Sequence, residues 1–278
     1  MDDAVQEADL QDIEIRLLLE GIYARYGFDF RDYALASIRR RIASRLEPEG
    51  VKSDSGLLER VLHEPACMEQ LLLALTIHVS SMFRDPGFYV AFRSQVLPQL
   101  RTYPYARVWG AGCSSGEEIY SLAILLKEEG LYERCRIYAT DLSEVVLRQA
   151  KAGVFPLRAM KEYTENYVKA RCQAEFSNYY AADHENAVFR PALRENVLFA
   201  PHNLVTDSSF NEFNVILCRN VMIYFNDKLQ ERVHRLLYDS LAMFGFLGLG
   251  SKESLRFSPY EDRYEEVDAR EKLYRKVR

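Results

Sequence analysis

Long apolar runs are missing from this sequence of 278 residues. Its apolar stretches reach only about five to seven residues, as in 71–75, whereas a membrane-spanning helix needs about 20. The chain opens with the acidic segment MDDAVQEADLQDIE, which lacks the charged-then-apolar order of a secretory signal. The sequence therefore predicts no direct membrane insertion, and we expect the protein in the cytoplasm.

Paired cysteines and an excess of positive charge are also missing. None of the five cysteines forms a CxxC pair or a cysteine–histidine group with zinc-ligand spacing, so we expect free thiols and no metal. Lys+Arg number 36 against 41 Asp+Glu, a net charge of -5. This charge argues against a general nucleic-acid binder, although a local basic patch stays open. The 48% apolar and 28% charged residues exclude disorder for most of the chain.

The pattern of apolar residues changes near residue 100. Before it the spacing is helical, as in Leu35, Ile38, Ile42 and Leu46, and Gly27 predicts the end of an earlier helix. After it, apolar strand-like runs alternate with helical segments, which predicts an α/β fold with a mostly parallel sheet covered on both faces. The strand-like runs are 106–109, 136–140, 197–200, 214–218 and 246–249, with two more strands expected in 263–278 at an antiparallel edge.

Three regions follow from this pattern. We expect a helical N-terminal domain (1–85), a linker helix (86–104) and an α/β domain (105–278). Within the last, segment 173–195 breaks the alternation with two short strand-like runs around the polar turn AADHEN. The break predicts an inserted antiparallel hairpin.

The segment RVWGAGCSSGEEIYSLA is typical of a strand, a glycine-rich turn and a helix. Gly110, Gly112 and Gly116 allow a sharp turn and the close approach of a ligand. The next strand ends at Asp141, which is placed to accept hydrogen bonds from both hydroxyls of a ribose. These features predict a nucleoside-cofactor site at the carboxyl ends of the strands. The alternative is that the glycines only make a tight turn.

The residues after the turn distinguish two cofactor classes. A dinucleotide enzyme prefers G-x-G-x-x-G, with the helix start facing a pyrophosphate, whereas this chain has G-x-G-x-x-x-G followed by Glu117 and Glu118. Two carboxylates would repel a pyrophosphate but could accept from an ammonium. They favour S-adenosyl-L-methionine (SAM) over NAD, although one of them could simply stabilise the helix dipole.

Taken together, five motifs resemble the chemotaxis receptor methyltransferase (CheR) family from about residue 10 to the end. They are HVSSMFRDPGFY, WGAGCSSGEEIYSLA, ATDLSEVVLRQAKAGVF, HNL at 202–204 and FNVILCRNVMIYFN. The resemblance implies a class I SAM-dependent methyltransferase with a Rossmann-like sheet, an inserted antiparallel β subdomain and an all-helical N-terminal domain. It also implies O-methylation of glutamate side chains on chemoreceptor cytoplasmic domains, with S-adenosyl-L-homocysteine (SAH) as product.

The resemblance further assigns roles to single residues. Arg84 and Tyr224 would position the reacting groups as catalytic residues. The cofactor would be bound by His78, Ser80, Arg84, Gly110, Glu117 (ammonium), Asp141 (ribose), Asn203 and Leu204 (adenine), and Arg219 and Asn220 (methionine end). The family usually reads N-V-T where this chain has His78, Val79 and Ser80. Ser80 keeps the hydroxyl, but His78 can titrate and differs in shape.

The chemistry itself needs alignment rather than a base, because a carboxylate is already ionised at pH 7. Arg84 could hold this carboxylate, and the Tyr224 hydroxyl could orient it or the methyl group. The alternative for Tyr224 is a core aromatic. His202 and His234 need not be bases; a polar loop contact and a helix-surface position explain them as well.

The helix DYALASIRRRIASRL predicts a partner surface. Its four arginines, Arg39, Arg40, Arg41 and Arg45, either dock on an acidic helical partner or form a solvated face. The hairpin lacks the glycine turn of family members that bind a receptor tail peptide, so we expect a tail-independent enzyme. We also expect a monomer. Three rivals stay open: a carboxyl methyltransferase with another substrate, a non-catalytic SAM-responsive binding module and a nicotinamide oxidoreductase.

Overall fold

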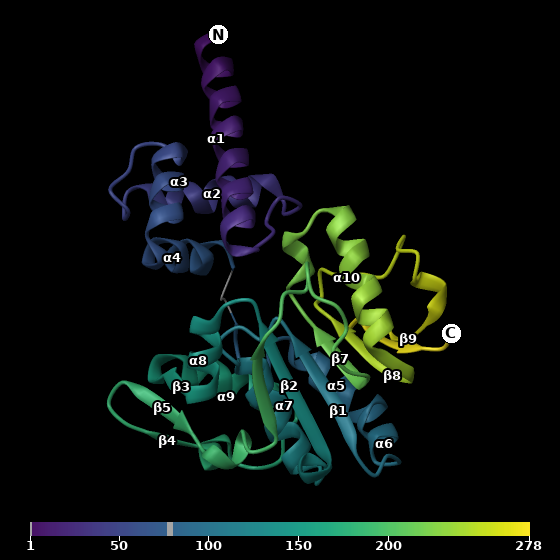
Figure 1. Ribbon diagram of the computed structural model, residues 1–278. Helices are drawn as coiled ribbons and strands as arrows, with labels where there is room; N and C mark the ends of the chain where they lie inside the picture. The colour runs from purple at the N-terminus through teal and green to yellow at the C-terminus, as the bar shows by residue number, and fades with distance from the viewer. Residues whose placement is uncertain (1, 77–79) are drawn as a thin grey trace. The chain divides into compact units, whose positions relative to one another are not determined.

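The structure of the protein is a computed structural model that describes residues 2–76 and 80–278 (Figure 1). The chain forms two compact units, each of which is described by itself. One comprises Met1–Ile77 with Tyr224–Gln230, and the other His78–Ile223 with Glu231–Arg278. The domain boundaries that the sequence suggests at residues 85 and 105 stay a prediction.

The first unit is helical, as the periodicity predicts. Its helices are α1 (Asp2–Tyr26), α2 (Leu35–Leu46), α3 (Asp54–His63) and α4 (Pro65–Leu75). Gly27 ends α1 with a left-handed φ of 75°, and its N–H donates to the carbonyl of Tyr23 at 2.9 Å. α2 buries Ile38 and Ile42, which belong to the predicted apolar stripe.

A short segment from the second half of the chain completes the helical unit. The amide of Ala34 donates to the Tyr224 carbonyl at 2.9 Å, and the amide of Asn226 donates to the Asp32 carbonyl at 3.0 Å. The ring of Phe225 meets that of Tyr33 edge-on, with centroids 4.8 Å apart. Segment 224–230 therefore belongs to the helical unit by its contacts, which local periodicity cannot indicate.

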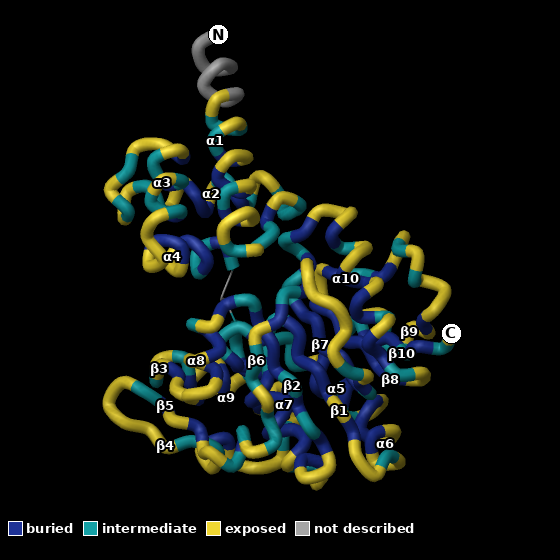
Figure 2. The backbone as a smooth tube through the Cα atoms, viewed as in Figure 1, coloured by how far each residue is buried: buried dark blue, intermediate teal, exposed yellow. Residues whose placement is uncertain are grey.

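The second unit is built on a seven-stranded sheet with the order β6-β2-β1-β7-β8-β10-β9. Pairing is parallel from β6 to β8 and antiparallel from β8 to β9, which confirms the predicted mostly parallel sheet and its antiparallel edge. The strands are β1 (Ala106–Ala111), β2 (Cys135–Asp141), β6 (Val197–Pro201), β7 (Phe213–Cys218), β8 (Leu241–Leu249), β9 (Tyr264–Asp268) and β10 (Leu273–Lys276). Figure 2 shows β1 and β7 buried along most of their length, because helices cover both faces of a parallel sheet.

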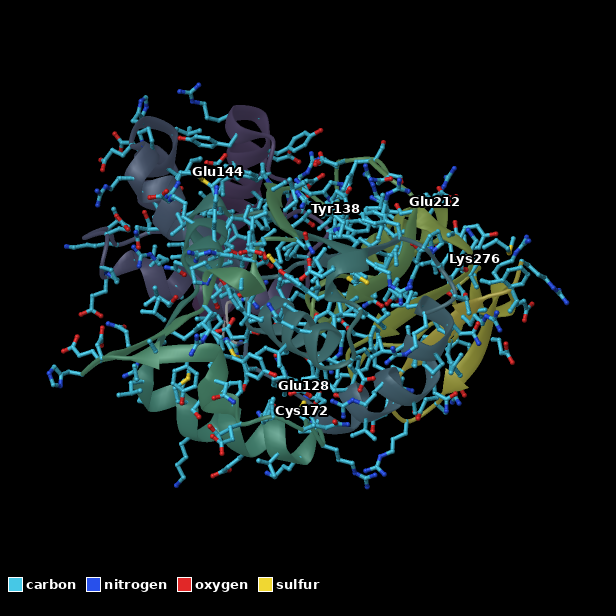
Figure 3. All side chains as sticks on the ribbon, turned by 90° about the horizontal axis from the view of Figure 1, so that it is seen from below. Glu128, Tyr138, Glu144, Cys172, Glu212 and Lys276 are labelled. Carbon is cyan, nitrogen blue, oxygen red and sulfur yellow. The ribbon has the colours of Figure 1, made fainter. Side chains whose placement is uncertain are left out.

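The helices of this unit are α5 (Pro86–Gln95), α6 (Leu97–Leu100), α7 (Glu117–Glu128), α8 (Glu144–Ala152), α9 (Met160–Lys169) and most of α10 (Asp227–Ser240). The expected linker helix is two helices, since Pro98 lacks the N–H that would bond back to residue 94. Lys276, labelled in Figure 3, donates to the carbonyls of Tyr238 (2.8 Å) and Leu241 (2.7 Å) at the end of α10. This contact ties the last strand to α10, where a cation also favours the helix dipole.

The inserted subdomain is a three-stranded antiparallel sheet with the order β3-β5-β4. The predicted hairpin is confirmed as β4 (Tyr180–Ala182) and β5 (Asn186–Phe189). In its turn, Asp183 Oδ1 accepts from the amides of Glu185 (2.8 Å) and Asn186 (2.6 Å). The third strand, β3 (Val154–Pro156), lies outside the predicted 173–195. Three residues are too few to show a period of two, so the pattern of apolar residues does not indicate this strand.

One buried carboxylate anchors this small sheet. Glu128, at the end of α7, accepts from the hydroxyls of Tyr167 and Tyr179, the latter at 3.0 Å, and from the amide of Gln173 at 3.1 Å. Figure 3 shows Cys172 close to Glu128. Burial and the Glu128 charge raise the pKa of this thiol to about 12. The segment that leads into the hairpin is therefore bound to the large sheet's own helix.

Among the described residues, no helix has the length and apolarity needed to cross a membrane.

Candidate cofactor-binding site

The strand order gathers the predicted site at one edge of the large sheet. β2 and β6 lie on one side of β1, and β7 and β8 on the other, so the topology switches direction between β1 and β7. In open α/β sheets ligands bind outside the carboxyl ends of the strands at such a point. The structure brings together the ends of four adjacent strands, which carry Asn203 and Leu204 (after β6), Asp141 (β2), Gly110 (β1), and Arg219 and Asn220 (after β7).

The glycine turn is required by the backbone itself. Gly112 and Gly116 have φ of 77° and 96°, in the left-handed region that favours glycine. A Cβ on Gly112 would lie 2.6 Å from Cγ2 of Val221, and one on Gly116 would lie 2.9 Å from Cβ of Ala150. The tight-turn interpretation is therefore correct for these two glycines, and it is compatible with ligand binding at the same turn.

Asp141 is fixed by the backbone around it. Its carboxylate is 8% exposed, and Oδ2 accepts from the Ser114 amide at 2.8 Å while Oδ1 accepts from the Ser143 amide at 3.1 Å. These two bonds orient the carboxylate at the end of β2, and its contact with the hydroxyls of a ribose stays a prediction.

Glu117 is a buried carboxylate at the first residue of α7. It is 6% exposed, and it accepts from the hydroxyls of Ser115 (2.8 Å) and Tyr163 (3.2 Å). Burial raises the pKa of Glu117, and hydrogen bonds, including one from Ser80, oppose that rise. Within the described residues Glu117 forms no salt bridge. A buried carboxylate suits a cationic partner, so Glu117 is compatible with the ammonium of SAM, a role that stays a prediction.

Glu118, next in the chain, has a different partner. Its Oε1 lies 2.7 Å from a guanidinium nitrogen of Arg219, and a second nitrogen of Arg219 lies 3.0 Å from Oδ2 of Asp85. The buried guanidinium also lies over the ring of Phe88, 4.1 Å from its centroid. Arg219 is thus an internal clamp between the end of β7, the start of α7 and the turn before α5. Its predicted contact with SAM stays a prediction.

The turn that carries Arg84 is held in a costly backbone conformation. Phe83 and Asp85 have φ of 50° and 55°, which are unusual for residues other than glycine. The amide of Phe83 donates to Oγ of Ser121 at 2.8 Å, and the carbonyl of Arg84 accepts from Arg219 at 3.3 Å. These contacts with Ser121 and Arg219 therefore fix the backbone from which the Arg84 side chain extends. His78 lies outside the described residues, and Ser80 is near enough to Glu117 to lower the pKa of that carboxyl.

The adenine prediction concerns a turn beside Asp141. The amide of His202 donates to the Asp141 carbonyl at 3.1 Å, which joins this turn to β2. Asn203 uses its side-chain oxygen for the Val205 amide at 2.9 Å, and Leu204 is buried. The turn therefore adjoins Asp141, and the adenine role of Asn203 and Leu204 stays a prediction.

The position expected from the sequence is correct for His202 and wrong for His234. Nε2 of His202 lies 3.2 Å from the carbonyl of Ser208, a polar loop contact as expected. His234 is buried, so its expected position on a helix surface is wrong. Burial lowers the pKa of His234 to about 4, which makes it neutral at pH 7.

Tyr224 is half-buried and belongs to the helical unit, where it meets Arg41. The Arg41 guanidinium lies 4.9 Å from the centroid of the Tyr224 ring, and it donates to the carbonyl of Leu75. Arg41 is only 6% exposed, so the docking prediction is wrong for this residue. The helical period explains why: Arg41 lies three positions after Ile38 and one before Ile42, within the apolar stripe.

For the other three arginines the docking role stays a prediction. Arg39 is paired with Asp12, Arg45 is paired with Glu49, and Arg40 is exposed.

Sequence reasoning missed several supporting residues of this site. Asp85 lies inside the quoted motif FRDP beside Arg84, so the motif could have indicated it. Tyr163 and Glu253 come from α9 and from the loop after β8, and no local pattern marks either residue. Their part in the site depends on contacts that only the folded chain makes.

This edge suits a cofactor with a ribose and an ammonium, and the paired glutamates at the start of α7 disfavour a pyrophosphate there. The fold and the site together define a SAM-dependent methyltransferase. Comparison with protein families identifies the family within this class. Residues 13–76 match the CheR methyltransferase all-alpha domain, and residues 78–272 match the CheR methyltransferase SAM binding domain. The chain belongs to the CheR methyltransferase family, and its cofactor is SAM.

Relatives match nearly the whole chain. Putative methyltransferase Cher3 of Pseudomonas putida is 52% identical over 265 residues, which cover 95% of this chain and 97% of that protein. The chemotaxis protein methyltransferase of Listeria monocytogenes is 30% identical, covering 82% of this chain and 85% of that protein. The Escherichia coli protein of the same name is 29% identical, covering 92% and 88%.

Proposed function

We propose that this protein transfers the methyl group of SAM to glutamate side chains of chemoreceptor cytoplasmic domains. Relatives named chemotaxis protein methyltransferase support the pathway. The main support for a carboxylate substrate is the strained turn 83–85. This turn holds the cation Arg84 on a fixed backbone in the same unit as the cofactor site. A guanidinium matches a carboxylate in shape and charge.

The residues of this chain then bind and align the two reactants. When bound, SAM would supply an electrophilic methyl group on its sulfonium, and transfer of this group to a glutamate oxygen would give a methyl ester and SAH. Glu117 holds the ammonium, Asp141 holds the ribose, and Arg84 holds the carboxylate substrate. Tyr224 orients the reacting groups through its hydroxyl. Alignment and removal of water provide the rate, since the nucleophile needs no deprotonation.

Incubation with methyl-labelled SAM and isolated receptor signalling domains tests this proposal. We expect base-labile label in the receptor, as a glutamyl methyl ester requires, and none in receptor domains whose candidate glutamates are replaced by alanine. Label that resists base would favour a different acceptor group. SAM binding without label in any receptor would contradict the proposal and favour the non-catalytic binding module.

Receptor docking on α2 is a second expectation, and Arg40 is the residue that tests it best because its side chain is exposed. If Arg40 guides an acidic receptor helix, Arg40→Glu raises the KM for receptor on the order of threefold to tenfold at low salt. Affinity for SAM stays the same, because the SAM binding domain is residues 78–272. The wild-type KM rises with salt, since exposed charges are screened over about 10 Å at 0.1 M.

Arg16→Glu is the matched control, since Arg16 is an exposed arginine on α1 of the same helical unit. Equal effects of the two reversals would show a general charge effect. Kinetics of Arg40→Glu identical to those of the wild type at low salt would leave α2 with a solvated face.

A further inference from the structure

A single carboxylate holds the loops that follow β7 and β8. Glu253, in the loop after β8, is 5% exposed. Its Oε2 accepts from the amides of Asn220 at 2.8 Å and Gly250 at 2.6 Å. Its Oε1 accepts from the amides of Val221 at 2.8 Å and Met222 at 2.7 Å. Both oxygens are therefore used by backbone donors, three of which belong to consecutive residues of one turn.

That turn has a backbone that needs outside support. Asn220 has a φ of 62°, in the left-handed region that costs energy for residues other than glycine. A Cβ on Gly250 would lie 2.7 Å from the amide nitrogen of Asn220 and 2.8 Å from its side-chain nitrogen. The loop after β8 thus packs directly against Asn220, and only glycine leaves enough space there.

The residue before Asn220 is held from the opposite side. Arg219 is locked by its ion pairs with Glu118 and Asp85. The turn 219–222 is consequently fixed at its first residue by Arg219 and at its next three by Glu253. Arg219 and Asn220 are also the residues expected at the methionine end of SAM, so the carboxylate lies directly behind a predicted ligand contact.

Burying a carboxylate costs free energy, so a carboxylate that holds a loop from inside the protein needs compensating interactions. Burial raises the pKa of Glu253, whereas the four backbone hydrogen bonds lower it by favouring the ionised form. Charge-assisted bonds to a carboxylate are roughly twice as strong as neutral ones. They can hold a strained residue such as Asn220 where an uncharged acceptor would hold it less firmly.

We propose that Glu253 is a positioning residue that fixes Asn220 in the conformation the SAM site uses. This inference rests on the proposed cofactor role of Asn220. Glu253 itself does not touch the cofactor; it acts through the backbone of the turn.

Calorimetry with SAH tests the proposal without any receptor, so its outcome is separate from that of the proposed methylation. Glu253→Gln keeps the size of the side chain, removes the charge and turns one acceptor into a donor. We expect SAH affinity to fall on the order of 10-fold to 100-fold, the range seen when supporting residues behind metal ligands are removed. Glu261→Gln is the matched control, because the exposed Glu261 also accepts a backbone amide, that of Phe257 at 2.8 Å, in the segment between β8 and β9.

A double-mutant cycle with Asn220→Gly separates positioning from a purely structural role. Glycine tolerates the left-handed φ, so this variant removes the side chain without straining the turn. If Glu253 acts through Asn220, the double variant binds SAH no more weakly than Asn220→Gly alone. Additive losses would overturn the proposal, and so would wild-type affinity in Asn220→Gly.

Glu253→Asp covers the case in which Glu253→Gln does not fold. It retains the charge but is one methylene shorter, so it cannot satisfy all four amides. A folded Glu253→Asp variant is expected to bind SAH more weakly than the wild type at temperatures well below its Tm. Wild-type affinity in either folded Glu253 variant would overturn the proposal.

Discussion

Replacing Asp141 with asparagine is expected to weaken SAH binding by about 2–4 kcal/mol, which is roughly a 30-fold to 1,000-fold loss of affinity. The physical reason is the loss of charge on a group that is predicted to accept from both ribose hydroxyls. The amides of Ser114 and Ser143 already fix the carboxylate, so the predicted contact with the ribose needs no reorganisation of this group. Calorimetry of SAH with the purified variant measures the loss directly.

Asparagine also disturbs the two amides that Asp141 accepts from, so the experiment needs a control of the same kind. Asp183→Asn provides it, because Asp183 also accepts two backbone amides, but in the turn of the inserted hairpin. Backbone hydrogen bonds lower the pKa of Asp183, so this residue is ionised at pH 7. Unchanged SAH affinity in a folded Asp141→Asn variant would remove Asp141 from the site.

Local sequence patterns predicted those parts of the fold that depend on local physics. Apolar runs such as 214–218 are buried on both faces of the sheet, and that demand alone makes them recognisable. Gly112 and Gly116 are recognisable because their positive φ excludes most other residues. Asp141 follows from its place at the end of a strand, since parallel strands end together at one edge.

Contacts between distant parts of the chain account for what the sequence left unseen. Glu253 gains its role only because the ends of β7 and β8 are neighbours in the sheet. Segment 224–230 joins the helical unit through pairing with residues 32–34, almost 200 positions earlier. Arg41 is a different case: its helical spacing from Ile38 predicts burial, but its charge suggested a surface. Contact with the Tyr224 ring and the Leu75 carbonyl stabilises the charge inside the unit.

Replacing Tyr224 with phenylalanine is expected to lower the turnover of receptor methylation by about one to three orders of magnitude, the range expected for lost alignment of reactants. Only the hydroxyl is removed, and the ring stays in place for Arg41. The fold of the helical unit and the affinity for SAH are therefore expected to change little. Methylation kinetics at saturating SAM, together with SAH calorimetry, separate the two quantities.

The matched control for this variant is Tyr23→Phe. Tyr23 is in the same helical unit and also lies under a guanidinium, that of Arg31, 3.8 Å from its ring centroid. Both substitutions remove a hydroxyl from a ring that an arginine covers, but only Tyr224 follows the turn 219–222, two residues further along the chain. A loss of turnover confined to Tyr224→Phe therefore assigns the effect to the Tyr224 hydroxyl. Full turnover in Tyr224→Phe would mean that Tyr224 is a half-buried aromatic whose ring stabilises the buried guanidinium of Arg41.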